Sequence, residues 1–445
     1  MRSPFRRPGP YSLLVAALLA AAALAAAPHA LAGKRAHRPR PPARHHDPEL
    51  KPFVDVLALT AEGRRVFRED TFGSEAFWGG RLRLHEALAD VPPAAALEVG
   101  LKVDAGALPA SLRARLRRGA VDLDDPAVTL ELLRLDAVVG VRGFFAGGRL
   151  ASVGIRCALC HSTVDDALLP GVGQRLDGWA NRDLDVGRVI ALAPDLSPFG
   201  ALLGVDEATV CAVLTSWGPG KFDASLLLDG KALRPDGRSG AVLIPPAFGL
   251  AGVNLHTWTG WGSVPHWNAL VANLEMGGQG TFVDHRLDDA ARFPIAARAG
   301  FSELRSDPDR VTGKLAALHV YQLALRAPKP PPGSFDRAAA RRGQQVFDGP
   351  GRCASCHVPP LYTEPGHNLH APAEIGIDDF QAERSPTRGY RTAPLAGLWT
   401  HGKGGYYHDG RFPTLRAVVD HYDAHFGLGL DEARKRDLIE FLKSL

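Results

Sequence analysis

The sequence shows no excess of one charge and no long apolar run beyond its N-terminus. Its 52 basic side chains stand against 48 acidic ones, for a formal net charge of +4. A chain this balanced has no broad field to attract nucleic acid, and we exclude nucleic acid as a partner. After the first 27 residues no stretch is long and apolar enough to cross a bilayer. The sequence therefore predicts no membrane span in the mature protein.

Methionine and cysteine are scarce. Apart from the initiator the chain has one methionine, Met276, and it has five cysteines. Four of these form two Cys-x-x-Cys-His motifs, at 157–161 and 353–357. This composition yields about 0.002 chance matches to one such motif, so two are not accidental. A zinc site would need further thiols, and the remaining Cys211 lies in an apolar helical pattern typical of a buried core thiol.

The spacing within each motif fits covalent attachment of haem. In a helical turn the two cysteines share one face, so both thiols can add to the vinyl groups of one haem. The histidine that follows then meets the iron as its proximal ligand. The sequence predicts a dihaem c-type cytochrome, with these haem contacts in chain order: Cys157, Cys160, His161, Cys353, Cys356 and His357.

The N-terminus predicts export. Three arginines precede an apolar run from Leu13 to Ala27, and the small-residue site Ala30-Leu31-Ala32 follows. The run is about 15 residues, short of the roughly 20 that span a bilayer, which favours a signal peptide over a retained anchor. We predict a signal peptide over 1–32, then a flexible basic and Pro-rich leader over 33–50. The predicted location is periplasmic or secreted.

A chain of 445 residues exceeds one hydrophobic core and predicts two folding units. The segments 59–68 and 338–347 are near copies that share Gly, two polar residues, Val and Phe. The distance from the shared Gly to the first motif cysteine is 94 positions in one copy and 10 in the other. We interpret this as two related haem domains, 51–327 and 335–445, the first with a large insertion. The Pro-rich segment 328–334 is the predicted linker.

Helical periodicity dominates wherever a pattern can be followed, as over 315–325 and 438–445. Many glycines and prolines separate these pieces. The predicted fold class is mainly α, with two cytochrome c-like haem domains, long loops and little sheet.

The sixth ligand of haem 2 cannot be a methionine of its own domain, because none follows the second motif. Ligation by His/His, by His/Tyr or an open site remains possible. His421 and Tyr422 stand out because both lie on an apparent helix beyond His357. Adjacent helical residues point about 100° apart, so only one of them can reach the iron. The sequence leaves this choice open.

A Trp- and His-rich stretch at 254–267 is the predicted distal wall of haem 1. The candidates for catalytic residues there are His256, Trp258, Trp261 and His266. Met276 and His85 are candidate distal ligands of this haem. An alternative is a loop whose indoles only cover the haem edge. A further alternative is an open site for a small oxidant, with an indole relaying electrons to haem 2.

The C-terminal half resembles bacterial dihaem cytochrome c peroxidases and the methylamine dehydrogenase maturation enzyme, on Thr392–Leu395 and Gly405–Leu415. Residues 50–150 look like an elaboration of uncharacterised periplasmic dihaem cytochromes. This resemblance implies a high-spin peroxidatic N-terminal haem and an electron-transferring C-terminal haem. It also implies Met or Tyr as distal ligand of the second haem, which points to Tyr422. Calcium between the domains is usual in the family, and 181–185 offers oxygens for it.

Three functions are open at this stage. The first is an oxidoreductase with electron transfer between two haems and activation of peroxide or dioxygen at haem 1. The second is a plain electron carrier with both irons six-coordinate, and the third is an oxygenase of an organic compound, with the insertion shaping a channel. The expected partners are a small cytochrome or cupredoxin and a small oxidant such as peroxide. Without a thioether ligand, haem 2 is expected to have a lower potential than a His/Met haem.

Overall fold

The protein is described from a computed structural model, which covers residues 51–445. The predicted signal peptide (1–32) and leader (33–50) lie outside the described residues. Pro52–Leu445 form one compact unit. Between the helices that end at Ala324 and begin at Arg337 the chain has neither helix nor strand. The division into haem domains at 328–334 stays a prediction.

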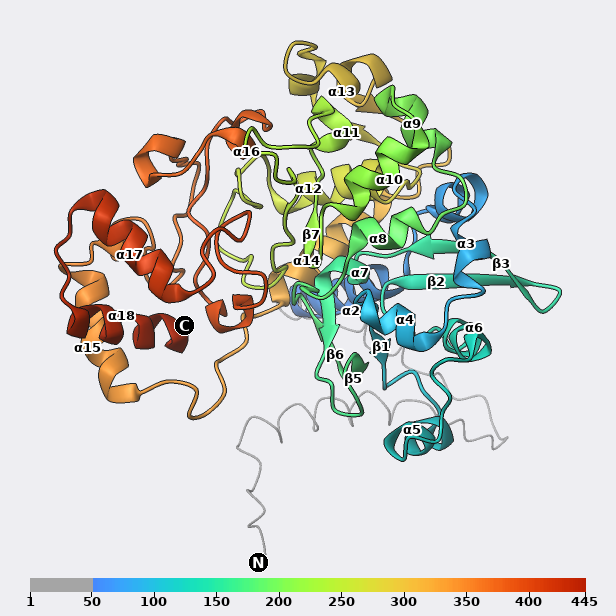
Figure 1. Cartoon of the computed structure of the whole chain (residues 1–445), viewed down its shortest axis with the longest axis horizontal. Helices are drawn as coiled ribbons and strands as arrows, with labels where there is room; N and C mark the ends of the chain where they lie inside the picture. The colour runs from blue at the N-terminus through green and yellow to red at the C-terminus, as the bar shows by residue number, and fades with distance from the viewer. Residues whose placement is uncertain (1–50) are drawn as a thin grey trace, which may run out of the picture. The chain divides into compact units, whose positions relative to one another are not determined.

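Helices dominate residues 51–445, so the mainly α class is confirmed (Figure 1). The α-helices before the Pro-rich segment are α2 (Lys51–Glu69), α3 (Leu84–Leu88), α4 (Pro93–Glu98), α5 (Ala110–Arg117), α6 (Pro126–Arg134), α7 (Ala158–His161), α8 (Val186–Ala191), α9 (Ser197–Leu203), α10 (Glu207–Thr215), α11 (Leu226–Asp229), α12 (Val264–Leu270), α13 (Pro294–Ala299) and α14 (Leu315–Ala324). Those after it are α15 (Arg337–Asp348), α16 (Phe380–Glu383), α17 (Leu415–Phe426) and α18 (Glu432–Ser444). The π-helices are η1 (Ala76–Arg81) and η2 (Val271–Glu275). The 3₁₀ turns are η3 (His285–Asp288), η4 (Thr312–Lys314), η5 (Cys353–Ser355), η6 (Pro372–Ile375) and η7 (Leu398–His401).

Strands are short and pair two at a time. They are β1 (Val103–Asp104), β2 (Val141–Ala146), β3 (Arg149–Ile155), β4 (Ser162–Val164), β5 (Val172–Gly173), β6 (Arg175–Asp177), β7 (Lys221–Phe222), β8 (Val242–Leu243), β9 (Phe282–Val283) and β10 (Glu303–Leu304). The β1–β5 pair is parallel, and the pairs β2–β3, β4–β6, β7–β8 and β9–β10 are antiparallel. No larger sheet forms among the described residues, as the expectation of little sheet requires.

Helices α9 and α10 are the nearest approach to a membrane-spanning pattern. Over residues 51–445 no single helix has both the length and the apolar character to cross a bilayer, whereas α9 and α10 meet both criteria together but are bent by 94°. Cys211 lies on α10, half-buried against the largest apolar cluster. The prediction of a core thiol is therefore right about its surroundings and wrong about full burial.

The two near copies of sequence form the same helix crossing. In α2, a Cβ on Gly63 would lie 1.9 Å from the carbonyl oxygen of Ala317 in α14. In α15, a Cβ on Gly343 would lie 1.9 Å from the carbonyl oxygen of Asp437 in α18, and Figure 1 shows these two helices side by side. The shared Val-Phe pairs are buried in both copies: Val66, Phe67, Val346 and Phe347. The repeat thus encodes a close helix contact that only glycine permits.

Gly343→Ala should lower the free energy of unfolding by about 1–3 kcal/mol, because the added methyl group forces α15 and α18 apart. Gly313 provides the matched control, since a Cβ there meets nothing within 4 Å. Gly313→Ala should change the stability by less than roughly 0.5 kcal/mol. Urea denaturation followed by circular dichroism measures both variants. Equal stability of the two would contradict the packing role of Gly343.

The residues of the predicted insertion are packed into an apolar core and do not form an extended surface loop. Leu84 of α3, Leu112 of α5, Leu132 of α6 and Val153 of β3 belong to one buried cluster with residues of α8 and α10. Leu159, inside the first Cys-x-x-Cys-His motif, lies in the same cluster. The insertion therefore supports the first motif directly through apolar packing.

A buried ion cluster joins segments on either side of the Pro-rich segment. Arg384, which follows α16, is 1% exposed. Its guanidinium donates to Asp229 at 2.8 Å and to Asp223 at 3.1 Å. Arg234 donates to Asp378 at 2.7 Å nearby. Charges removed from water are tolerated only when paired, so these contacts hold 223–234 and 378–384 in a fixed relation.

Candidate haem-binding sites

The first motif sits on the single turn α7. The His161 amide donates to the Cys157 carbonyl at 3.2 Å and closes the turn. Cys157 and Cys160 are three positions apart, so their thiols lie on one face. Gly140, with φ of +78°, comes so close to Leu159 that a Cβ would lie 2.1 Å from its amide nitrogen. A glycine here lets β2 press against the motif.

The functional groups of the first motif are partly shielded from solvent. Cys157, Cys160 and His161 each keep some accessible surface. Burial nevertheless raises the pKa of both thiols to about 12 and lowers the pKa of His161 to about 4, a fall that the Pro245 carbonyl opposes. The imidazole is therefore neutral, which is the form that ligates a metal. These residues fit a covalently attached haem.

The second motif forms the 3₁₀ turn η5, whereas the first is α-helical. The same bond closes it, from the His357 amide to the Cys353 carbonyl at 2.9 Å. Burial lowers the pKa of His357 to about 4, against the opposing effect of the Tyr362 carbonyl. That carbonyl lies 3.1 Å from His357 Nδ1, which leaves Nε2 for an iron. Both proximal imidazoles are thus neutral, but they are held differently, because Nδ1 of His161 has no hydrogen-bond partner among the described residues.

Helix α17 carries the two candidate distal ligands of haem 2. His421 Nε2 lies 2.9 Å from the Ile375 carbonyl oxygen, and its ring packs on Phe412 at 4.8 Å between centroids. Burial raises the pKa of Tyr422, its hydrogen bond with Tyr407 opposes the rise, and the nearby thiols of Cys356 and Cys353 add to it. The structure therefore brings Tyr422 toward the second motif and engages His421 with η6.

A histidine with two carboxylates lies beside the second motif. Within residues 51–445, Cys356, Glu364 and His370 form a group whose candidate ligand atoms all lie within 4.8 Å of one another. His370 Nε2 is 2.7 Å from Glu364, and its Nδ1 is 2.7 Å from Glu374. Both ring nitrogens are thus engaged, and Cys356 is a predicted haem thiol. We assign this group to the surroundings of the second motif and not to a separate metal.

His370 should make the stability fall as the pH rises. Burial lowers its pKa, but hydrogen bonds to Glu374 and Glu364 outweigh burial and raise the pKa above 6.5. Folding thus favours the charged form, so the contribution is complete below pH 6.5 and is lost as the pH passes the raised value. Guanidinium denaturation from about pH 5 to 9 of the wild type and His370→Gln measures the difference. A pH-independent difference would contradict the charged pairing.

Of the four candidates in the Trp- and His-rich stretch, His256 and Trp261 line a cleft of about 730 Å³. The opposite walls come from α14 and from 367–387. Trp258 lies outside this lining and donates from Nε1 to the Leu243 carbonyl at 2.8 Å. His266 is also outside it, with Nε2 3.8 Å from Asp284. Neither the cysteines nor the histidine of the first motif line the cleft. The four candidates of the Trp- and His-rich stretch therefore lie in different surroundings.

Met276 and His85 lie in different places. Met276 is buried in an apolar cluster that contains Ala158 and, at its edge, Cys157. Its carbonyl accepts a bond from Trp78 Nε1 at 2.7 Å. His85 lies on α3, which packs on β3, and its Nδ1 is buried without a hydrogen bond. The structure thus places Met276 in the same apolar cluster as Ala158 of the first motif.

Glu275 is a polar group at the first motif that the sequence analysis missed. Burial raises its pKa to about 8, and Asp223 adds to the rise. The charge of Glu275 also contributes to the raised pKa of Cys160, so these two side chains lie near each other. A carboxyl with a pKa close to neutrality can give and take a proton. The sequence feature that could have identified Glu275 is a single acidic residue directly after the mostly apolar run 271–274.

The segment proposed for calcium is engaged with protein partners. Asn181 Nδ2 donates to the Gly100 carbonyl at 2.9 Å. Asp183 pairs with Lys102 at 2.7 Å and with Lys403. Asp185 caps α8. The calcium ion stays a prediction, and these contacts give it no support.

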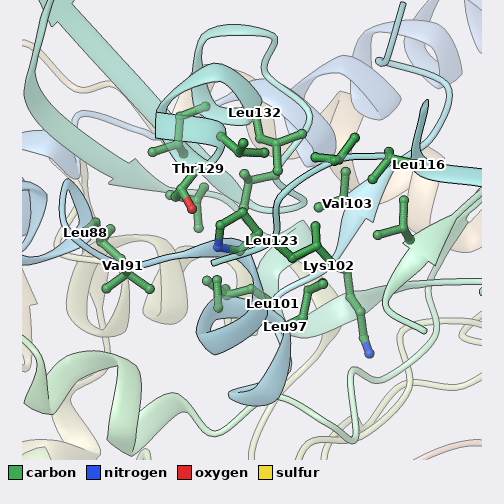
Figure 2. Close-up of a pocket in the computed structure, with 18 of the residues that line it drawn as sticks. Leu88, Val91, Leu97, Leu101, Lys102, Val103, Leu116, Leu123, Thr129 and Leu132 are labelled. Atoms are coloured by element: carbon green, nitrogen blue, oxygen red, sulfur yellow. The ribbon is translucent and has the colours of Figure 1, made fainter. Parts of the chain in front are cut away.

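An enclosed apolar cavity of about 40 Å³ lies within the insertion. Figure 2 shows its wall of leucines and valines, among them Leu97, Leu123 and Leu132, with the amine of Lys102 directed away from them. That amine reaches Asp183 at 2.7 Å. A cavity of this size and lining stays dry. The residues of the first motif do not line it, so it is no channel to haem 1 and does not favour the oxygenase hypothesis.

Comparison with known proteins gives one curated relative and a distant structural match. No protein-family model matches the chain. The chain is 27% identical over 230 residues to the methylamine utilization protein MauG of Methylorubrum extorquens, and the match covers 45% of this chain and 63% of the relative. A solved structure of Kuenenia stuttgartiensis hydrazine synthase matches 48% of this chain and 76% of that one, at 19% identity and a TM-score of 0.26. The chain thus spans less than two thirds of the relative's length.

Proposed function

We propose that the protein is an exported dihaem c-type oxidoreductase that activates peroxide or dioxygen at haem 1 and transfers electrons through haem 2. The observation that carries this proposal is the pair of closed Cys-x-x-Cys-His turns, each with a neutral, half-buried proximal histidine. The similarity to MauG supports a redox enzyme. Bound haem iron would supply the redox chemistry, and the protein would supply ligands, protons and an electron route.

The two sites differ in what faces them. Near the first motif, Glu275 holds a proton at a carboxyl whose pKa is about 8, and it can exchange that proton with a bound oxidant. At the second motif, Tyr422 is our proposed distal ligand, because His421 is bonded to the Ile375 carbonyl. The first site would then be the reactive one and the second an electron relay.

An aromatic pair connects the two sites. Trp179 follows Gly178, whose amide donates to the His161 carbonyl at 2.8 Å. Its ring meets that of Trp399 edge to face, at 5.3 Å between centroids. Leu398, the neighbour of Trp399, belongs to the apolar cluster that Cys353 borders. This contact supports electron transfer between the haems within one chain.

Location and partners follow from the same chemistry. Covalent haem attachment and the predicted signal peptide favour the periplasm or the outside of the cell. We propose a small cytochrome or cupredoxin as the redox partner and peroxide as the small oxidant.

Low-temperature electron paramagnetic resonance of the oxidised protein tests this function. We expect one high-spin signal from haem 1 and one low-spin signal from haem 2, and cyanide should convert the first to low spin. Haem analysis should give two haems per chain. Two low-spin signals that do not change when cyanide is added would overturn the proposal of oxidant activation. That result would instead favour a plain electron carrier.

A further inference from the structure

Arg182 is a buried arginine that has no carboxylate partner among the described residues. Its side chain is 7% exposed, and its Nε and Nη1 atoms have no hydrogen-bond partner among the described residues. Burial alone lowers its pKa to about 10, with no carboxylate to oppose the fall. The other buried arginines each donate to a carboxylate: Arg156 to Asp136 at 2.8 Å, Arg234 to Asp378 at 2.7 Å and Arg384 to Asp229 at 2.8 Å. Arg182 thus differs from these three arginines by lacking a counter-charge, and from the half-buried Arg391, which donates to the carbonyls of Thr257 and Leu255, by having Nε and Nη1 without an acceptor.

A second basic group lies beside it. His401 of η7 has a buried Nε2 without a partner. Burial and the charge of Arg182 together lower its pKa to about 3. The adjacent carboxylate, Asp183, is paired with Lys102 and Lys403. An unpaired guanidinium in such surroundings is strongly unfavourable, so the arrangement calls for an anion.

Both groups lie next to the first motif. The Asn181 amide donates to the Cys160 carbonyl at 2.8 Å, which fixes the backbone just before Arg182. On the other side, the ring of Phe248 stacks on His401 with 6.4 Å between centroids. Phe248 follows closely on Pro245, whose carbonyl faces His161. Short stretches of backbone therefore join both side chains to residues that contact the first motif.

We propose that Arg182, with His401 beside it, binds a carboxylate of the haem attached at Cys157 and Cys160. This rests on the haem attachment of the proposed function. Haem carries two carboxylates on flexible arms, and the planar guanidinium fork matches a carboxylate with two parallel hydrogen bonds. Since η7 comes from the chain after the Pro-rich segment, filling this site would also tie Leu398–His401 to haem 1.

Arg182→Gln in the full-length haem protein tests the site through the midpoint potentials of both haems, measured by spectroelectrochemical titration. Loss of a positive charge beside the carboxylate favours ferric iron. We expect the ferric-to-ferrous equilibrium constant of haem 1 to shift at least threefold toward ferric, with haem 2 unchanged. Arg188→Gln is the matched control, because Arg188 on the neighbouring α8 has a side chain 52% exposed and should leave both potentials unchanged.

The outcomes separate this proposal from the proposed function. Fewer than two haems per wild-type chain would refute the function itself. With two haems present, unchanged potentials in Arg182→Gln, or a shift confined to haem 2, would overturn the carboxylate site. If the potential of wild-type haem 1 depended on added acetate at constant ionic strength, a free carboxylate and not the haem would be the ligand.

A second variant keeps the proposal testable if Arg182→Gln fails to fold. Arg182→Lys keeps the charge but loses the fork, so it should fold and still weaken the bond. The bending mode of the haem carboxylate in the resonance Raman spectrum should then move from its wild-type position. An unmoved band in Arg182→Lys would overturn the assignment.

Discussion

Tyr422→Phe should abolish the low-spin signal of haem 2 and make that haem five-coordinate. The hydroxyl is the only atom of Tyr422 that can bind an iron, and phenylalanine removes it while keeping the ring. His421→Phe is the matched control on the same helix, because Nε2 of His421 is engaged with the Ile375 carbonyl. We expect this control to leave the signal in place.

Electron paramagnetic resonance of both variants, with haem content as a check on assembly, measures this effect. If His421→Phe lost the low-spin signal and Tyr422→Phe retained it, the ligand would be the imidazole. That outcome would also require α17 to rotate about its axis by about 100° from its observed position.

Arg384→Met should lower the free energy of unfolding by about 3–5 kcal/mol, because Asp223 and Asp229 would remain buried without a cation. Burial already raises the pKa of Asp223, and Arg384 is the main group that opposes this rise. The loss should therefore be larger at neutral pH than in acid, where the carboxylates are protonated. Denaturation with urea at both pH values gives the comparison.

The neighbouring arginine supplies the control for this experiment. Arg388 has an exposed side chain 3.6 Å from Glu383, and Arg388→Met should change the stability by less than about 1 kcal/mol. Adding Asp229→Asn to Arg384→Met should restore part of the loss, since one buried charge is removed. A loss of under 1 kcal/mol in Arg384→Met would contradict the bridging role of the cluster.

Local signals explain what the sequence could predict. The apolar periodicity predicted helices at α2, α14, α15, α17 and α18, whereas the two crossings at the repeated glycine became visible only in the structure. The choice between His421 and Tyr422 could not be made in this way. It depends on how α17 is rotated about its axis, which contacts with Phe412 and η6 determine. Those contacts join residues distant in the sequence.

The surroundings of the Trp- and His-rich stretch at 254–267 were harder still to predict. Thr257 and Gly260 adopt left-handed backbone angles, with φ of +63° and +60°, so the chain reverses within a few residues. This separates His256 and Trp261, which line the cleft, from Trp258. Arg182 and Glu275 could not be identified from the sequence for a different reason. Nothing in the local sequence reveals whether a charged side chain will be buried without a partner.

The two helix crossings differ in the length of chain that separates the residues in contact. Gly63 and Ala317 are 254 positions apart, whereas Gly343 and Asp437 are 94 apart. Bringing the ends of the longer loop together costs about 0.9 kcal/mol more in chain entropy. The α15–α18 contact therefore needs less of the chain to be ordered before it forms, whereas the α2–α14 contact encloses the whole predicted insertion and forms only at a larger entropic cost.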